Sequence, residues 1–168
     1  RLKRINNRSE FGHFEGDTVE GRRSVGDGIH TEVERVSRMF FAQKVKTINS
    51  EETIKVQTEI FSDLPEKARK STTLDNGREN HLHMKLNKNL NMKTYFCHPY
   101  ASYERGTNEN TNGLIRRYLP KQTDFSTLSQ KELDEIVLEI NSRPRKVLKY
   151  QTALEVFTSL ISDCSDST

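Results

Sequence analysis

The chain has 168 residues, of which 32% are apolar and 30% are charged. This length suits a single domain, and the near balance of 27 basic against 24 acidic residues, a net charge of +3, excludes a disordered polyelectrolyte. No run approaches the ~18 consecutive apolar residues of a membrane-spanning helix, and no apolar core of the signal-peptide type opens the chain.

Two cysteines, Cys97 and Cys164, stand far apart in the sequence. They form neither a disulfide framework nor a structural zinc site. Cys97 ends an apolar run and is expected to be a buried thiol. A reducing cytosol is therefore the expected compartment. Because the first residue is Arg1, we expect the sequence to be a fragment of a longer protein, with residues 1–11 as a linker or the start of that fragment.

Three strands are predicted near the beginning, at residues 12–19, 29–35 and 39–45. The turn-rich segment 21–28 separates the first two, so the three strands favour an antiparallel meander. A helix follows, capped by Asn49 or Ser50 at its start.

Strands and helices then alternate. A short strand is predicted at 71–74, and a helix at 79–90 carries leucines at every fourth position, which favours a core-facing stripe. Ser129 and Glu132 form a capping box at the start of a later helix. The remaining expected elements are a strand at 94–97, a loop at 98–107, helices beginning at 108 and 152, and a polar, disordered tail at 162–168. This order predicts an α/β fold with a mixed sheet and helices on its faces.

Three acidic residues stand in contexts that suit metal ligation. Asp17 lies in the first strand, Asp75 ends the fourth and precedes the turn pair Asn76-Gly77, and Glu109 opens a polar helix. Two strand-borne carboxylates and one helix-borne carboxylate can hold a pair of Mg²⁺ ions for phosphoryl transfer. Taken singly, each has an ordinary alternative, because Asp-Asn-Gly is good turn chemistry and a glutamate early in a helix favours the helix dipole.

Basic residues cluster at the start of the chain and in its second half. Such clusters around an acidic site suit a phosphate backbone, although ordinary solvated faces explain them equally well. The five histidines are scattered, none at metal-binding spacing with a cysteine, and are expected at the surface.

Several sequence strings resemble the catalytic domain of the IS-thirty family of bacterial insertion-sequence transposases. The resemblance extends over about residues 12–157. The matching strings are Gly16-Asp17-Thr18, Leu74-Asp75-Asn76-Gly77, Tyr103-Glu104-Arg105, Gly106 to Leu114, Leu119-Pro120-Lys121, Thr123-Asp124-Phe125 and Asn141 to Lys146. The most specific of them are Gly106 to Leu114 and, within the last string, Arg143 to Lys146. It implies a ribonuclease-H-like (integrase core) fold, a mixed five-stranded sheet flanked by helices, over residues 12–161.

The family resemblance also implies roles for individual residues. Asp17 would bridge two Mg²⁺ ions, for which Mn²⁺ can substitute, while Asp75 and Glu109 would each complete one site. Arg116, two helical turns after Glu109, would contact a DNA phosphate. The other residues expected to bind DNA are Arg117, Lys121, Arg143, Arg145 and Lys146, and those expected to support the site are Asn76, Gly106, Asn108 and Asn112.

The implied function is a DDE transposase that cleaves DNA at transposon ends and then joins the freed 3′-OH to target DNA. The expected partner is double-stranded DNA, both the terminal inverted repeats and the target, bound by a homodimer or a larger assembly in the bacterial cytoplasm and at the nucleoid, with no membrane.

The sequence departs from the family pattern in two places. The second strand is unusually polar, and Glu32 within it would need partners if it were buried. Asn80 and His81 stand where apolar residues are expected. Two alternatives therefore stay open: a catalytically decayed integrase-core module for DNA binding or assembly, and a related structure-selective nuclease.

Overall fold

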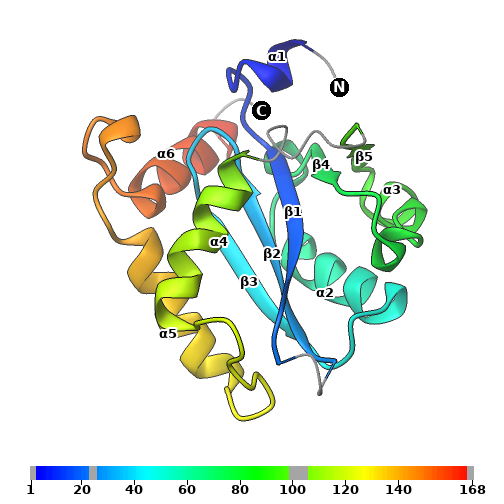
Figure 1. Ribbon diagram of the computed structural model, residues 1–168. Coiled ribbons are helices and arrows are strands. Elements are labelled where there is room, and N and C mark those ends of the chain that lie inside the picture. The colour runs from blue at the N-terminus through cyan, green and yellow to red at the C-terminus, as the bar shows by residue number, and fades with distance from the viewer. Residues whose placement is uncertain (1–2, 23–25, 99–105, 166–168) are drawn as a thin grey trace.

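The computed structural model describes residues 3–22, 26–98 and 106–165. Its centre is a mixed five-stranded sheet of order β3-β2-β1-β4-β5 (Figure 1). Strands β1 to β3 pair antiparallel, whereas β4 runs parallel to both β1 and β5. The expected mixed sheet is thus confirmed, with strands β1 (His13–Glu20), β2 (Gly28–Glu34), β3 (Phe40–Val45), β4 (Ser71–Leu74) and β5 (Lys93–Phe96).

Helices cover both faces of the sheet, as Figure 1 shows. Helices α4 and α5 pack on one face, and α2 and α3 pack on the other. The helices are α1 (Lys3–Asn6), α2 (Ser50–Ser62), α3 (Met84–Leu90), α4 (Gly106–Tyr118), α5 (Gln130–Asn141) and α6 (Ala153–Ser165), with single 3₁₀ turns η1 (Glu66–Ala68), η2 (Arg78–Asn80) and η4 (Lys146–Leu148).

The sheet separates two apolar cores because successive side chains of a strand point to opposite faces. On the α4–α5 face, Val33 and Phe40 meet Ile115 and Ile140. The other core lies beneath α2 and α3 and contains Phe14, Ile54, Phe61, Leu86 and Met92. Each core thus has the sheet as one wall.

Local capping signals in the sequence are confirmed. The Asn49 side chain accepts hydrogen bonds from the first-turn amides of α2. Ser129 and Glu132 form the predicted capping box of α5. The Cys97 thiol is buried, as expected.

Three expected boundaries are wrong. The predicted helix at 79–90 is η2 followed by a turn, and only α3 is helical, because the Asn80 side chain turns back to hold Asp75. A short helix, α1, stands within the segment taken as a linker. Helix α6 continues to Ser165, so residues 162–165 of the predicted disordered tail are helical. Residues 99–105 of the predicted loop and 166–168 of the tail lie outside the described residues.

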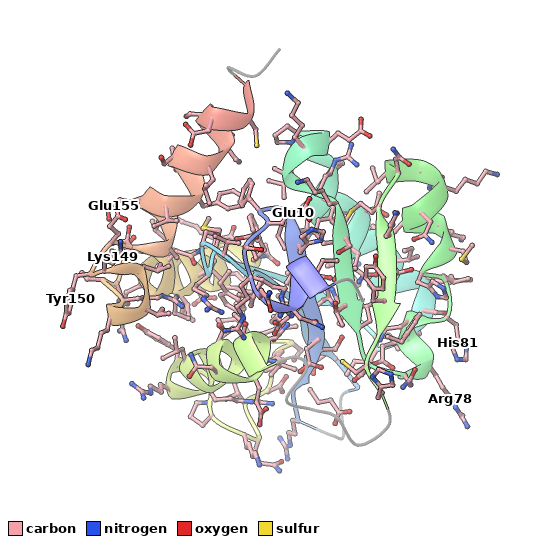
Figure 2. All side chains as sticks on the ribbon, turned by 90° about the horizontal axis from the view of Figure 1, so that it is seen from above. Glu10, Arg78, His81, Lys149, Tyr150 and Glu155 are labelled. Atoms are coloured by element: carbon pink, nitrogen blue, oxygen red, sulfur yellow. The ribbon has the colours of Figure 1, made fainter. Side chains whose placement is uncertain are left out.

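Helix α6 packs through aromatic contacts at one end of the molecule. Phe157 makes edge contacts with Phe11 and Phe41, at centroid distances of 5.4 and 5.6 Å. Seen from above, the connection before α6, marked by Tyr150, lies on the opposite side from η2, marked by Arg78 (Figure 2). Within the described ranges, none of the helices combines the length and apolar character of a membrane span.

Candidate active site

Asp17 lies in β1, and Asp75 directly follows β4, the strand that runs parallel to it. The β1–β4 register ends with the pair Glu15 and Thr73, two residues before Asp17 and Asp75 respectively. By alternation, Asp17 points to the same face as Glu15, which α4 covers. The parallel pairing therefore places two segments that carry carboxylates, far apart in sequence, on neighbouring strands.

Gly16, directly before Asp17, stands where neighbouring side chains leave no space for a Cβ atom. A Cβ at this position would stand 2.6 Å from a Leu74 methyl group and 2.6 Å from a Glu32 oxygen. Both neighbours are fully buried. A larger residue would push β1 away from β4 and move Asp17 with it.

Helix α4 is fastened to β1 by Asn108 and Glu15. The Asn108 side-chain amide donates to the Glu15 carbonyl oxygen (2.6 Å), and the Asn108 backbone N–H donates to the Glu15 carboxylate (2.9 Å). Glu15 thus caps the first turn of α4, where negative charge is favourable. Arg35 completes a buried ion pair with Glu15 at 2.6 Å.

One turn further along α4, Asn112 holds Asp17. The Asn112 amide donates to Asp17 Oδ2 at 3.0 Å, while its oxygen accepts from the Thr31 hydroxyl at 3.2 Å. Glu109 stands between Asn108 and Asn112 in the sequence and is exposed. The two asparagines therefore fix the helical turn that carries Glu109 beside the strand that carries Asp17.

Asp75 has its own amide partner. The Asn80 side chain and the Gly77 backbone N–H both donate to Asp75 Oδ1, each at 2.9 Å. Asn76 points elsewhere and donates to the Cys97 carbonyl oxygen at 3.0 Å, which ties the turn to β5. Asn80, a departure from the family pattern, thus orients one of the candidate ligands.

The three carboxylates come from adjoining elements, but they do not converge. Among the described residues, no three His, Cys, Asp or Glu side chains approach closely enough to hold a metal ion. The donor set nevertheless suits Mg²⁺, which prefers carboxylate oxygens. Asp17 and Asp75 are half-buried and already oriented, and the exposed Glu109 side chain is free to rotate. Their metal-binding role stays a prediction.

Arg116 lies differently from the expected DNA contact. Its guanidinium donates to the carbonyl oxygens of Glu20 (2.7 Å) and Pro120 (3.4 Å), which fastens the end of α4 to the end of β1. It also lies over the Phe125 ring, 6.0 Å from the centroid, and burial lowers the pKa of Arg116. Arg117 is exposed on the same helix.

The other residues expected to bind DNA fall into two groups. Lys121 and Lys146 are exposed. Arg143 is paired with Glu139 at 2.7 Å, whereas Arg145 is half-buried, and burial lowers its pKa. Arg143 and Arg145 line one cavity, apart from the aspartates. The structure thus separates these basic residues into different surroundings.

The polar second strand is satisfied inside the protein. All seven residues of β2 are buried. The Glu32 carboxylate accepts from Gln57 (3.1 Å) and Thr72 (2.8 Å) and lies 3.0 Å from the His30 ring nitrogen. Burial raises the pKa of Glu34, although Ser37 and backbone amides donate to it. The expectation that all histidines lie at the surface is wrong for His13 and His30, which are both buried.

Glu15 and Arg35 shape the site but were not singled out from the sequence, and Asn80 was noted only as a departure from the family pattern. Glu15 stands two residues before Asp17, on the same strand face, and this spacing was an available signal. The sequence gives no local signal for the partners of Arg35 and Asn80, since these are set by strand pairing and by the turn after β4.

Solved structures with the same fold support the architecture. The catalytic core domain of BIV integrase superposes with a TM-score of 0.69 at 16% identity, covering 94% of this chain and 99% of that one. A chain of the simian T-cell lymphotropic virus intasome in complex with PP2A regulatory subunit B56 gamma gives a TM-score of 0.70 at 19% identity. The match covers 88% of this chain and 54% of that one. The protein therefore has the ribonuclease-H-like fold of integrase catalytic cores.

Sequence relatives identify the family within that fold. Transposase InsI for insertion sequence element IS30A of Escherichia coli is 41% identical over 156 residues, which are 93% of this chain and 40% of the relative. The transposase for insertion sequence element IS1086 of Cupriavidus metallidurans is 37% identical over 166 residues, which are 99% of this chain and 49% of the relative. The chain belongs to the IS30 family of transposases and spans less than half the length of these relatives. No family model matches the sequence.

Proposed function

We propose that this chain is the catalytic part of a transposase that cleaves DNA at transposon ends and joins the freed 3′-OH to target DNA. The observation that carries the proposal is the parallel pairing of β1, which holds Asp17, with β4, which Asp75 directly follows, beside the α4 turn that carries Glu109. Family membership supports the same class of reaction.

Asp17, Asp75 and Glu109 would hold two Mg²⁺ ions in this proposal. Bound Mg²⁺ supplies Lewis acidity, which activates a water or hydroxyl nucleophile and stabilises charge on the leaving oxygen. The protein contributes orientation. Asn112 and Asn80 each hold one carboxylate oxygen of an aspartate, so these side chains lose little rotamer freedom when the site fills.

The polypeptide supplies no nucleophile in this reaction. Hydrolysis breaks a phosphodiester bond and leaves a 3′-OH on the DNA, and that hydroxyl then attacks a target phosphodiester while another 3′ oxygen leaves. One ester replaces another in the joining step, so no nucleotide hydrolysis is required. The acting form would be a dimer or larger assembly on double-stranded DNA, because two transposon ends must be held together.

The satisfied second strand weakens one ground for the decayed-module alternative, since the buried Glu32 has three partners. The nuclease alternative differs in the fate of the 3′-OH, and a joining assay separates the two.

Mn²⁺ binding and DNA joining test the proposal together. Calorimetric titration of the chain with Mn²⁺ should show binding that the Asp75→Asn exchange reduces at least tenfold, because one ligand oxygen becomes a neutral amide. In the full-length protein, the same exchange should abolish joining of transposon ends. Asp63→Asn, an exposed position at the end of α2, is the matched control and should change neither.

Two results would overturn the proposal. If the Asp75→Asn variant joins DNA as well as the unaltered protein does, Asp75 takes no part in the reaction. Cleavage by the unaltered protein without any joining assigns the chain to the nucleases.

A further inference from the structure

A cavity lined by four arginines lies apart from the candidate active site. Its volume is about 460 Å³, within the range of about 300–1,000 Å³ that is common for small-ligand sites. Arg8 follows α1, Arg38 stands in the β2–β3 turn, and Arg143 and Arg145 follow α5. We call this site the arginine cavity. Segments remote in sequence bring four guanidinium groups to its walls.

Positive charge in the arginine cavity is only partly balanced. None of the described residues that line it is acidic. Arg143 is ion-paired with Glu139 at 2.7 Å, and its guanidinium lies 5.5 Å from the centroid of the Tyr118 ring. The charges of Arg8, Arg38 and Arg145 remain.

The nearby carboxylates that act on Arg38 are Glu15 and Glu34. Glu15 is committed to its buried ion pair with Arg35. Glu34 is committed to Ser37 and to backbone amides, including that of Gly12. Neither carboxylate lines the cavity.

One N–H group of the Arg38 guanidinium has no hydrogen-bond acceptor among the described residues. Its Nη1 donates to the Thr107 hydroxyl at 2.9 Å, but its Nε is buried and has no hydrogen-bond partner among the described residues. Burial lowers the pKa of Arg38, and the positive charges of Arg8 and Arg145 lower it further. A buried, unpartnered guanidinium nitrogen is costly unless an anion accepts its hydrogen bond.

Arg145 is held in place on the other wall. Its backbone N–H donates to Gln151 (3.0 Å), and its carbonyl oxygen accepts from Leu148 and Tyr150, both at 2.9 Å. Its side chain donates to the Ile140 carbonyl oxygen at 3.2 Å and is half-buried. Little conformational freedom would be lost on binding a ligand here.

The start of α4 also lines the cavity, through Gly106 and Thr107, its first two residues. The amino end of a helix favours anions through its dipole. The Asn108 N–H of this turn already donates to Glu15, so the arginines supply the main attraction for an anion.

The arginine cavity and the aspartates lie on different sides of α4. Thr107, Asn110 and Leu114 line the cavity, whereas Asn108 and Asn112 face the sheet. Successive helical residues are about 100° apart, which accounts for two distinct faces on one helix. A ligand in the cavity therefore does not occupy the position of the candidate metals.

We propose that the arginine cavity binds a phosphate group of a DNA backbone at a position that does not react. Guanidinium forks match phosphate oxygens, and arginine is the side chain best suited to bidentate phosphate contact. Taking DNA as the source rests on the proposed function. Free inorganic phosphate has the same chemistry, and the experiment separates the two sources.

The test uses two probes, both without divalent metal. The first is inorganic phosphate, followed through the amide resonances of Gly106 and Thr107. The second is a random-sequence DNA duplex, followed by fluorescence anisotropy over a range of salt concentrations. Arg38→Gln and Arg8→Gln remove one charge each, and Lys55→Gln, an exposed residue on α2 across the sheet, is the control. The second variant protects the test against misfolding of Arg38→Gln, which loses the Thr107 bond.

We expect phosphate to shift the two resonances in the unaltered chain but not in either arginine variant. Each arginine variant should bind DNA at least fivefold more weakly, with a salt slope lower by about one, and Lys55→Gln should change affinity less than twofold. Phosphate shifts without a loss of DNA affinity would overturn the assignment to DNA, and absence of both effects would overturn the site. Neither readout depends on metal binding or on DNA joining, so failure of the active-site proposal is told apart from failure of this one.

Discussion

Asparagine side chains position the candidate active site at the residue scale. Asn112 holds Asp17, Asn80 holds Asp75, and Asn108 ties α4 to β1. An amide suits this task because it donates to a carboxylate while its oxygen accepts from another group. Asn112 does both, since it also accepts from Thr31. These contacts explain how a polar helix packs against a sheet.

Glu32 shows how a charged residue is accommodated in the core. Its side chain is fully buried and has partners on three elements: His30 on its own strand, Gln57 on α2 and Thr72 on β4. A buried carboxylate of this kind is tolerated only when its oxygens are satisfied. The network also joins β2 to β4 across Gly16.

We expect Glu32→Ala to lower the free energy of unfolding by at least about 3 kcal/mol, because Gln57 and Thr72 would be left with unsatisfied buried donors at about 1–3 kcal/mol each. Urea denaturation followed by far-UV circular dichroism measures the loss. Glu135→Ala, an exposed position on α5, should change stability by less than about 0.5 kcal/mol. Equal effects of the two exchanges would contradict this account of Glu32.

Helix α5 covers the free edge of the sheet at the element scale. Strand β3 is an edge strand. The Asn141 side chain accepts from the Phe40 N–H (3.0 Å) and donates to the Phe40 carbonyl oxygen (2.8 Å), as a neighbouring strand would. At the other end, Gln130 accepts from the Lys44 N–H at 3.0 Å. The helix thus satisfies edge groups that would otherwise invite pairing with another chain.

Asn141→Ala should destabilise the protein by about 2–3 kcal/mol, since it leaves both backbone groups of Phe40 buried and unpaired. The neighbouring exchange Ser142→Ala, at an exposed position, is the control and should have little effect. Thermal or urea unfolding of the two variants gives the comparison. If Asn141→Ala is as stable as Ser142→Ala, the side chain does not substitute for a strand.

The whole molecule is organised as two apolar cores that share one sheet. Ile140 belongs to the core beneath α4 and α5, and Phe61 belongs to the core beneath α2 and α3. Both side chains are fully buried. Because β1 contributes Val19 to one core and Phe14 to the other, loss of one core should loosen the sheet that supports the other.

We therefore expect Ile140→Ala and Phe61→Ala each to lower the stability of the entire fold, by about 2–5 and 3–5 kcal/mol respectively. Unfolding in urea followed by far-UV circular dichroism and by tyrosine fluorescence should give coincident single transitions in both variants. Tyr118 packs against the α4–α5 core and reports on that side. Two separate transitions in either variant would show that the cores are independent.

The sequence by itself determined the elements that depend on near neighbours. The strands around Asp17 and before Asp75, the Asn49 cap and the Ser129–Glu132 capping box all follow from patterns a few residues long. It failed at residues 79–90, because the Asn80 side chain bonds to Asp75 instead of continuing a helix. Short-range preferences give way where a tertiary contact is stronger.

Only the tertiary structure decided which of these residues meet. The parallel pairing of β1 with β4 places the segments that carry Asp17 and Asp75 on neighbouring strands, and the docking of α4 gives Glu15 its partner Asn108, 93 residues away. The arginine cavity likewise joins Arg8 to Arg145. No local pattern encodes such pairs, because their geometry depends on how strands cross and on which face a helix covers. The sequence therefore determined the chemistry that the protein carries, and the fold determined where that chemistry is brought together.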